Sequence, residues 1–308
     1  MTTFIYWHDD CLAHDPGAGH PEQPARLRSV LEALRGEDMG GLAWLEAPLG
    51  QAADIARVHS DAHFASVIDA VPATGHRALD PDTVLSPGSG NAALRAVGGI
   101  TSAVDAVFAG EADNAFCALR PPGHHAEPAR AMGFCLFNNV AIGAARACHI
   151  HGAERVAVID FDVHHGNGTQ AMFEGDGDLF YGSSHQFPAY PGTGAASERG
   201  VGNIFNVPLA PGSGPDEFRT AYEDTIFPAL DEFGPEMILI SAGFDAHRDD
   251  PLCALNLEAG DFTWITGQLT ALAHTHCQGR LVSTLEGGYD LEALAQSAQA
   301  HVSVLMEA

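Results

Sequence analysis

Residues 155–168 contain the side chains of this sequence that are best suited to chemistry. A short apolar run, Val156–Ile159, is typical of a strand that is buried on both faces. Asp160, Asp162 and His164 then follow at alternate positions, which point the same way on an extended chain. Asp162 and His164 can therefore reach one metal ion, with Asp160 one step deeper on the same face. Such an oxygen and nitrogen donor set suits zinc, or less selectively iron(II) or cobalt.

A third metal ligand is expected because a catalytic zinc ion usually has three protein ligands and one open position for water. Asp245 is the best third ligand, since the apolar run 238–240 buries the strand before it and Gly243 frees the backbone to bend. Water bound to such an ion becomes a usable nucleophile near neutral pH. The sequence therefore predicts a metal-assisted hydrolytic site.

Hydrolysis also needs groups that move a proton and stabilise developing charge. His124 and His125, after a rigid Pro-Pro-Gly turn, are the candidate proton acceptors. Asp160 and Asn167 are expected to orient them, one for each histidine, and a charged and a neutral partner would separate their protonation states. Tyr289, on a Gly-Gly turn, is placed to donate a hydrogen bond to an oxyanion.

Each of these motifs follows an apolar segment that is predicted to be a strand, and helical segments fill the intervals. Strand–helix alternation predicts a parallel sheet with right-handed crossovers, and ligands bind beyond the carboxyl ends of such strands. We therefore expect one α/β domain over residues 1–308. The predicted strands are 4–7, 44–48, 114–119, 156–161, 237–241 and 281–285, and the predicted helices are about 20–34, 52–59, 61–70, 92–108, 140–151, 216–233, 259–277 and 291–305.

Three further segments carry polar residues outside these motifs. Arg26, on the first long helix, is either a surface cation or a residue that lines the site. His59 and His63 are four residues apart, and without an acidic residue in a metalloprotease arrangement they are expected to pack or cap. Residues 71–90 are rich in Pro, Gly, Asp and Ser and predict a loop that borders the site.

The charge and composition of the chain limit its partners. The 40 acidic residues outnumber the 14 basic ones, which gives a formal charge of −26 and disfavours binding to nucleic acid. The same charge attracts cations, including amine-bearing substrates. The six cysteines form no C-x-x-C pair, which favours reduced core residues and a cytoplasmic protein. We see no secretion signal and no run of about 18 apolar residues, so we expect no membrane span.

The ordered set of motifs resembles the zinc-dependent histone deacetylase family, which also includes bacterial acetylpolyamine amidohydrolases and acetoin-utilisation proteins. Asn167 and the Glu-Gly-Gly-Tyr sequence resemble the class II branch of that family. The resemblance implies the arginase/deacetylase fold, a central, mostly parallel sheet with helices on both faces. The motifs that carry it are Arg120–His125, Gly133-Phe134, Asp160–Gly168, Tyr190–Gly194, Gly243–Asp245 and Leu285–Tyr289.

The resemblance also implies roles for individual residues. Asp162, His164 and Asp245 match the zinc ligands, His124 and His125 match the tandem histidines that handle the proton, and Tyr289 matches the residue that polarises the amide carbonyl. Gly133, Phe134 and Tyr190 match a narrow tunnel for an acyl-lysine side chain, with Leu252 at its mouth. A structural potassium ion is implied at Asp160, Asp162, His164, Ser183 and Ser184.

The expected activity is the removal of acetyl or other acyl groups from the ε-amino group of lysine in peptides or proteins. The apolar Leu252 favours this substrate, because acetylpolyamine specialists are expected to place a carboxylate at the tunnel mouth. An acetylpolyamine remains the alternative substrate, and the acidity of the chain favours it mildly. Two other functions are weighed, a binuclear manganese ureohydrolase and a non-catalytic acyl-lysine or amine binder. Nothing in the sequence selects an oligomeric state.

Overall fold

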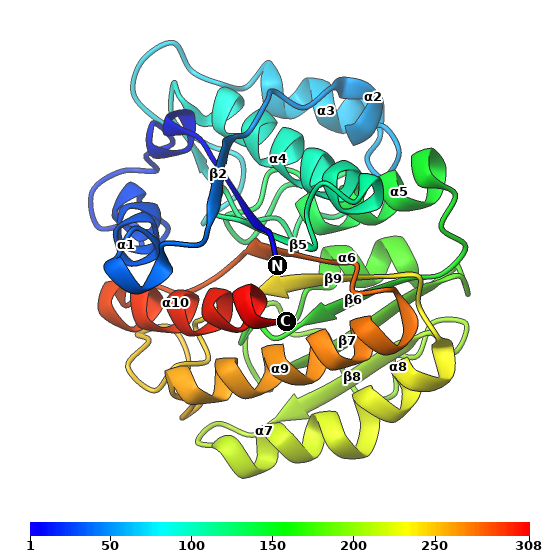
Figure 1. Cartoon of the computed structure of the whole chain (residues 1–308). Coiled ribbons are helices and arrows are strands. Elements are labelled where there is room, and N and C mark those ends of the chain that lie inside the picture. Colours follow the sequence, from blue (N-terminus) through cyan, green and yellow to red (C-terminus); the bar gives the residue numbers. More distant parts are fainter.

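A single eight-stranded sheet organises the chain, and the computed structural model describes all residues from 1 to 308 (Figure 1). Every strand pairs in parallel with its neighbours, in the order β2-β1-β5-β10-β9-β6-β7-β8. The predicted parallel α/β architecture is therefore confirmed. The strands are β1 (Thr3–Trp7), β2 (Ala43–Glu46), β5 (Asn114–Cys117), β6 (Val156–Asp160), β7 (Leu179–Gln186), β8 (Ile204–Leu209), β9 (Met237–Ala242) and β10 (Leu281–Leu285).

Helices cover both faces of this sheet. The helices α4 and α5 pack against strands on one face, and α8, α9 and α10 pack against strands on the other. The helix α1 lies against α10, as Figure 1 shows. The helices are α1 (Pro24–Leu34), α2 (Ala52–Ile55), α3 (Asp61–Ile68), α4 (Ser89–Ala109), α5 (Asn139–His151), α6 (Asn167–Phe173), α7 (Pro215–Ala221), α8 (Phe227–Phe233), α9 (Ala259–His276) and α10 (Leu291–Glu307), with short 3-10 turns at Asp9–Leu12 and Glu37–Met39.

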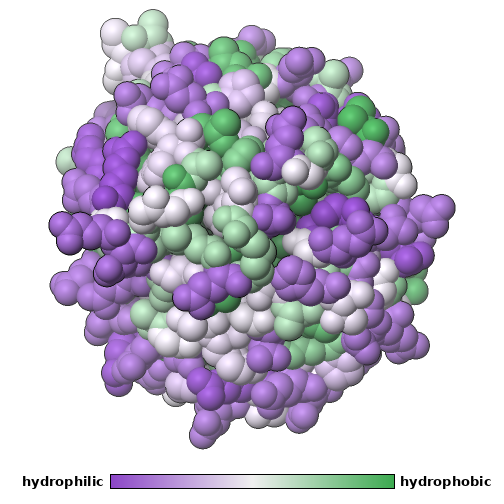
Figure 2. Space-filling model, in the orientation of Figure 1, coloured by the Kyte–Doolittle hydropathy of each residue, from purple (hydrophilic) through white to green (hydrophobic).

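The central strands are buried on both faces, which explains their continuous apolar sequences. All residues of β6, β9 and β10 are buried. The two chain termini lie close together, where Thr3 Oγ1 donates a hydrogen bond to the carbonyl oxygen of Leu305 at 3.1 Å. The face drawn in Figure 2 has hydrophilic residues mainly toward its rim, with neutral and hydrophobic residues mixed among polar ones across its middle.

The structure differs from the sequence prediction in several segments, among them the short helix α6, which was not predicted. Two strands, β7 and β8, were not predicted, because β7 carries polar residues at positions that are buried in the fold. The predicted helix over 216–233 is interrupted by a π-helical turn, Tyr222–Ile226, just before Pro228, which lacks an N–H group for a regular helix. The predicted loop over 71–90 contains a small antiparallel pair, β3 (Arg77–Ala78) and β4 (Val84–Leu85).

The helix α4 is the one helix that is long and apolar enough, by length and composition, to cross a membrane. Its apolar window has a mean hydropathy of 1.3, and 67% of that window is buried inside the fold. The helix packs against α5, β1, β5 and β10. Its hydropathy is thus accounted for by contacts within the domain.

Candidate active site

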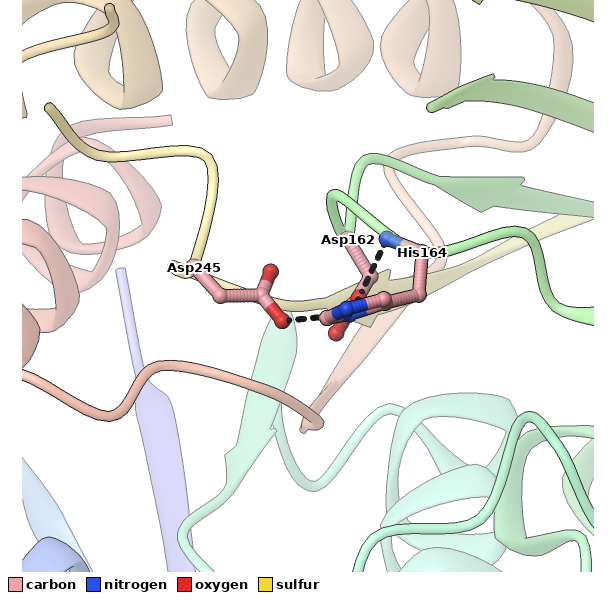
Figure 3. Close-up of side chains that lie close together, drawn as sticks. All are labelled: Asp162, His164 and Asp245. Carbon is pink, nitrogen blue, oxygen red and sulfur yellow. Dashed lines mark hydrogen bonds and ion pairs between the residues drawn. The ribbon is translucent and has the colours of Figure 1, made fainter. Parts of the chain in front are cut away.

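The loops after β6 and β9 bring three ligand-type side chains together at the carboxyl edge of the sheet (Figure 3). One ligand atom from each of Asp162, His164 and Asp245 lies within 4.8 Å of the others. His164 Nδ1 is 3.0 Å from Asp245 Oδ2 and 3.3 Å from Asp162 Oδ1. All three residues are buried. The structure thus joins the two residues of one motif to the third residue predicted 81 positions later.

The buried carboxylates of this cluster favour the binding of a cation. Burial opposes a charge on His164, yet Asp162 and Asp245 outweigh burial and raise the pKa of the imidazole well above its ordinary value. Burial and the charge of Asp162 raise the pKa of Asp245 to about 7. Two buried carboxylates and one imidazole nitrogen are donors that zinc accepts, and buried charges of this kind are paired or bind metals. The residues therefore fit a divalent metal ion.

Two glycines make room for the carboxylates of the cluster. A Cβ atom on Gly243 would lie 2.0 Å from Asp162 Oδ2, and one on Gly287 would lie 2.1 Å from Asp245 Oδ2. Gly287 N donates to Asp162 Oδ2 at 2.8 Å. Gly243 is therefore required for close packing against Asp162, and its φ lies outside the left-handed region.

The tandem histidines lie beside the cluster, each with its own partner. His124 Nδ1 is 3.0 Å from Asp160 Oδ2, and His125 Nδ1 is 2.8 Å from Asn167 Oδ1. Burial opposes a charge on His124, but Asp162 and Asp160 raise its pKa to about 10. Burial, together with the charges of His124 and His164, lowers the pKa of His125 well below its usual value. One imidazole is thus held charged and its neighbour neutral.

Glu286 supports the histidine pair, and the sequence analysis assigned it no role. Its Oε2 accepts hydrogen bonds from the backbone N–H groups of Gly123 at 2.6 Å and His124 at 3.1 Å. Burial raises the pKa of Glu286 to about 7. An acidic residue directly after the buried strand β10 was the signal for this contact, since such a residue needs a partner.

Arg26 and Asp250, which are both distant from Tyr289 in the sequence, hold this residue in place. The Arg26 guanidinium lies 4.7 Å from the centre of the Tyr289 ring and donates to the carbonyl oxygens of Glu286 and Gly288. Arg26 is fully buried, so it is a site residue and not a surface cation. Asp250 Oδ2 accepts from the backbone N–H of Tyr289 at 2.7 Å, a contact that sequence reasoning missed.

A tunnel of about 250 Å³ leads from the surface to this cluster. It reaches His125 and His164, and the exposed Leu252 lies at its mouth. Asp82, which the sequence analysis did not single out, also lines it. The lining residues are Asp82, His125, Gly133, Phe134, His164, Tyr190, Leu252 and Tyr289. The structure thus brings all four predicted substrate-binding residues to one tunnel.

The residues of the expected potassium site also lie together. Ser183 on β7 is the register partner of Asp160 on β6. Ser183 Oγ is 2.9 Å from His185 Nδ1, and Ser184 Oγ is 3.1 Å from the Tyr222 hydroxyl. Both serine hydroxyl groups therefore already have a protein partner.

Comparison with known proteins places this site in a family. The sequence model of the histone deacetylase domain matches residues 20–305. The chain belongs to the histone deacetylase family. It is 43% identical to a histone deacetylase-like amidohydrolase of Pseudomonas aeruginosa, over 88% of this chain and 73% of that protein. It is 38% identical to a probable deacetylase of Archaeoglobus fulgidus, over 95% of this chain and 82% of that protein.

The family membership agrees with the fold. A crystal structure of the HDA15 HD domain matches with a TM-score of 0.94 and 35% identity, over 99% of this chain and 90% of that one. The chain is therefore a hydrolase with histone deacetylase-type activity on an acetylated substrate, and the family is zinc-dependent. The arginase/deacetylase fold and the family resemblance predicted from the sequence are confirmed. The non-catalytic binder and the ureohydrolase considered above are set aside.

Proposed function

We propose that this chain is a zinc-dependent lysine deacetylase, which releases acetate from the ε-amino group of acetylated lysine in peptides or proteins. The observation that carries this proposal is the lining of the tunnel. Phe134 and Tyr190 provide aromatic walls, and Leu252, 40% exposed, gives the mouth an apolar edge. Such a channel suits the aliphatic stem of a lysine side chain, whereas a polyamine substrate would place a second cation near the mouth.

Asp82 is the one acidic residue of the tunnel lining, and its carboxylate is already engaged. Its Oδ1 accepts from Gly133 N at 3.2 Å and from Thr83 Oγ1 at 3.0 Å. Burial and a hydrogen bond with Asp80 raise the pKa of Asp82. These contacts favour a structural role for Asp82 over recognition of a substrate ammonium group.

The proposed chemistry assigns each polar residue of the site one task. Asp162, His164 and Asp245 would hold zinc, which supplies a Lewis acid for a carbonyl oxygen and lowers the pKa of water. Tyr289 donates a hydrogen bond to the amide oxygen as it gains charge. His125, which is neutral, accepts the proton of the attacking water at Nε2 and returns it to the departing ε-amine, giving acetate and an unmodified lysine side chain in the peptide.

His124 serves this reaction by keeping its charge. Asp160 and Asp162 hold it in the protonated form, so it supplies a fixed positive charge beside His125, with the two ring centres 4.0 Å apart. That charge lowers the pKa of His125 and keeps its Nε2 available to accept a proton. His124 thus provides electrostatic stabilisation, and His125 transfers the proton.

We also propose that potassium binds near Asp160 and Ser183, on the paired ends of β6 and β7. Its expected effect is structural, because Asp160 in turn orients His124. Replacing potassium with tetramethylammonium in the buffer, at constant ionic strength, should lower the melting temperature of the protein. An unchanged melting temperature and activity would contradict a bound potassium ion.

An acetylpolyamine deacetylase is the second candidate function, because the formal charge of −26 attracts polycations at long range. The deciding experiment compares kcat/KM for acetyl-lysine peptides with that for acetylputrescine and acetylspermidine on the purified zinc-loaded protein. We expect the peptides to be the better substrates at physiological ionic strength. A higher kcat/KM for the acetylated polyamines would assign the second function.

A further inference from the structure

The side-chain amide of Asn167 sits between two groups with opposite hydrogen-bonding needs. Its Oδ1 lies 2.8 Å from His125 Nδ1. Its Nδ2 donates to Glu127 Oε1 at 2.9 Å, and it also faces the His125 carbonyl oxygen and Met132 Sδ, each at 3.4 Å. All three groups around Nδ2 are acceptors. A flipped amide would turn its oxygen toward these acceptors and leave them without a donor.

We propose that Glu127 is a positioning residue of the deacetylation reaction, acting through Asn167 on His125. The Glu127 carboxylate can only accept, so it fixes the direction of the Asn167 amide. The amide oxygen then accepts from His125, which must carry its proton on Nδ1 and leave the Nε2 lone pair facing the tunnel. This inference rests on the proton-acceptor role of His125 under the proposed function.

Glu127 is itself held in place by a histidine that sequence analysis assigned to packing. His59 Nε2 accepts from the backbone N–H of Asn138 at 2.8 Å, so its Nδ1 carries the proton and donates to the Glu127 carbonyl oxygen at 3.0 Å. The Glu127 backbone also closes a turn with Arg130, with N···O distances of 2.9 and 3.3 Å. His63 stacks on His59 with ring centres 4.7 Å apart. Glu127 therefore presents its carboxylate from a rigid turn.

The amide at position 167 makes the proposal testable, because an aspartate at this position would not need Glu127 to set its orientation. Both oxygens of an aspartate accept, so His125 would keep its proton on Nδ1 without help. The Glu127 carboxylate, 2.9 Å from the present Nδ2 atom, would then face a second carboxylate and repel it. A change at Glu127 should therefore have opposite effects in the two backgrounds. A purely structural role would give the same loss in both.

The experiment measures kcat and KM of zinc-loaded wild type, Glu127→Met, Glu127→Gln, Asn167→Asp and Glu127→Met/Asn167→Asp. Met matches the size of Glu but offers only a weakly accepting, uncharged sulfur to the amide, whereas Gln retains an oxygen acceptor. We expect Glu127→Met to lower kcat by roughly 10-fold or more with little change in KM, as lost orienting partners do at other sites. Glu127→Gln should retain more activity than Glu127→Met.

In the Asn167→Asp background, Glu127→Met should leave kcat unchanged or raise it. Equal fold-losses in both backgrounds, or wild-type kcat in Glu127→Met, would overturn the proposal. Melting temperature and zinc content are measured for each variant, and the Gln variant keeps the test valid if the Met variant unfolds. If acetylated small amines prove to be the better substrates, the same ratios are taken on them, so the substrate assignment and this inference fail separately.

Discussion

Removing the hydroxyl group of Tyr289 is the sharpest test of how the site works. No protein group accepts a hydrogen bond from this hydroxyl, and the ring is held by other contacts. The Arg26 guanidinium lies 4.7 Å from the ring centre and the Phe134 ring centre is 5.8 Å away. Tyr289→Phe retains both contacts. The free energy of unfolding should therefore change by no more than about 0.5 kcal/mol.

The effect on catalysis should be far larger. Burial raises the pKa of Tyr289 well above its ordinary value, so the hydroxyl stays protonated and can donate throughout the working pH range. Loss of one oxyanion donor costs about 10²- to 10³-fold in kcat, or roughly 2.7–4 kcal/mol. We expect a loss of this size in Tyr289→Phe, with KM much less affected because the ring remains in the tunnel.

The assay follows acetate release from an acetyl-lysine peptide under saturating conditions, with zinc content and melting temperature measured in parallel. Tyr190→Phe is the matched control, because Tyr190 also lines the tunnel but its hydroxyl has no assigned task. The control should stay within about threefold of wild type, which corresponds to less than about 0.7 kcal/mol. A Tyr289→Phe protein that keeps its zinc and turns over as fast as the control would refute the oxyanion role.

Three further predictions test the metal, the tunnel mouth and the buried core. Zinc at 100 times its Kd should stabilise the metal-free protein against unfolding by about 2.7 kcal/mol and so raise its melting temperature. Asp245→Asn should abolish most of this rise in melting temperature. Leu252→Glu should raise the ratio of kcat/KM for acetylputrescine to that for an acetyl-lysine peptide roughly fivefold, as about 1 kcal/mol of exposed ion pairing allows; an unchanged ratio would remove Leu252 from substrate selection. Burial lowers the pKa of His301 from 6.5 to about 3, so unfolding takes up a proton in this range. Its contribution to stability is full above pH 6.5 and is lost as the pH falls toward 3, at up to about 1.4 kcal/mol per pH unit. Urea denaturation between pH 6 and 5 should show a shallower pH dependence for His301→Gln, and equal slopes would contradict the assignment.

Much of the site was predictable from local patterns of the sequence. Asp162 and His164 stand two positions apart after a buried strand, and Asp245 follows another such strand. The carboxyl ends of parallel strands meet at one edge, so strand assignment alone brings such residues together. Strand β7 was not predictable in the same way, because its polar residues Ser183 and Ser184 are satisfied by partners that no local pattern reveals.

The supporting residues were hidden for a related reason. Arg26 bonds to backbone carbonyls about 260 positions later in the chain, and Asp250 accepts from a backbone N–H 39 positions away. Backbone groups are the same at every residue, so the sequence carries no mark of which one a side chain will bind. Glu127 was missed because its partner is the amide of Asn167, and a glutamate next to a turn is ordinary on any surface.

By itself, the sequence determined the donor set, the order of the motifs and the reaction class, because residue type and strand-end position are local properties. The tertiary structure decided the protonation states and directions of those same groups. Burial and neighbouring charge shift the pKa values of His124 and His125 in opposite directions. The Asn167 side-chain amide has one orientation because its Nδ2 donates to Glu127 and its Oδ1 accepts from His125. Hydrogen-bond direction and desolvation depend on distances between side chains, and only the folded chain sets those distances.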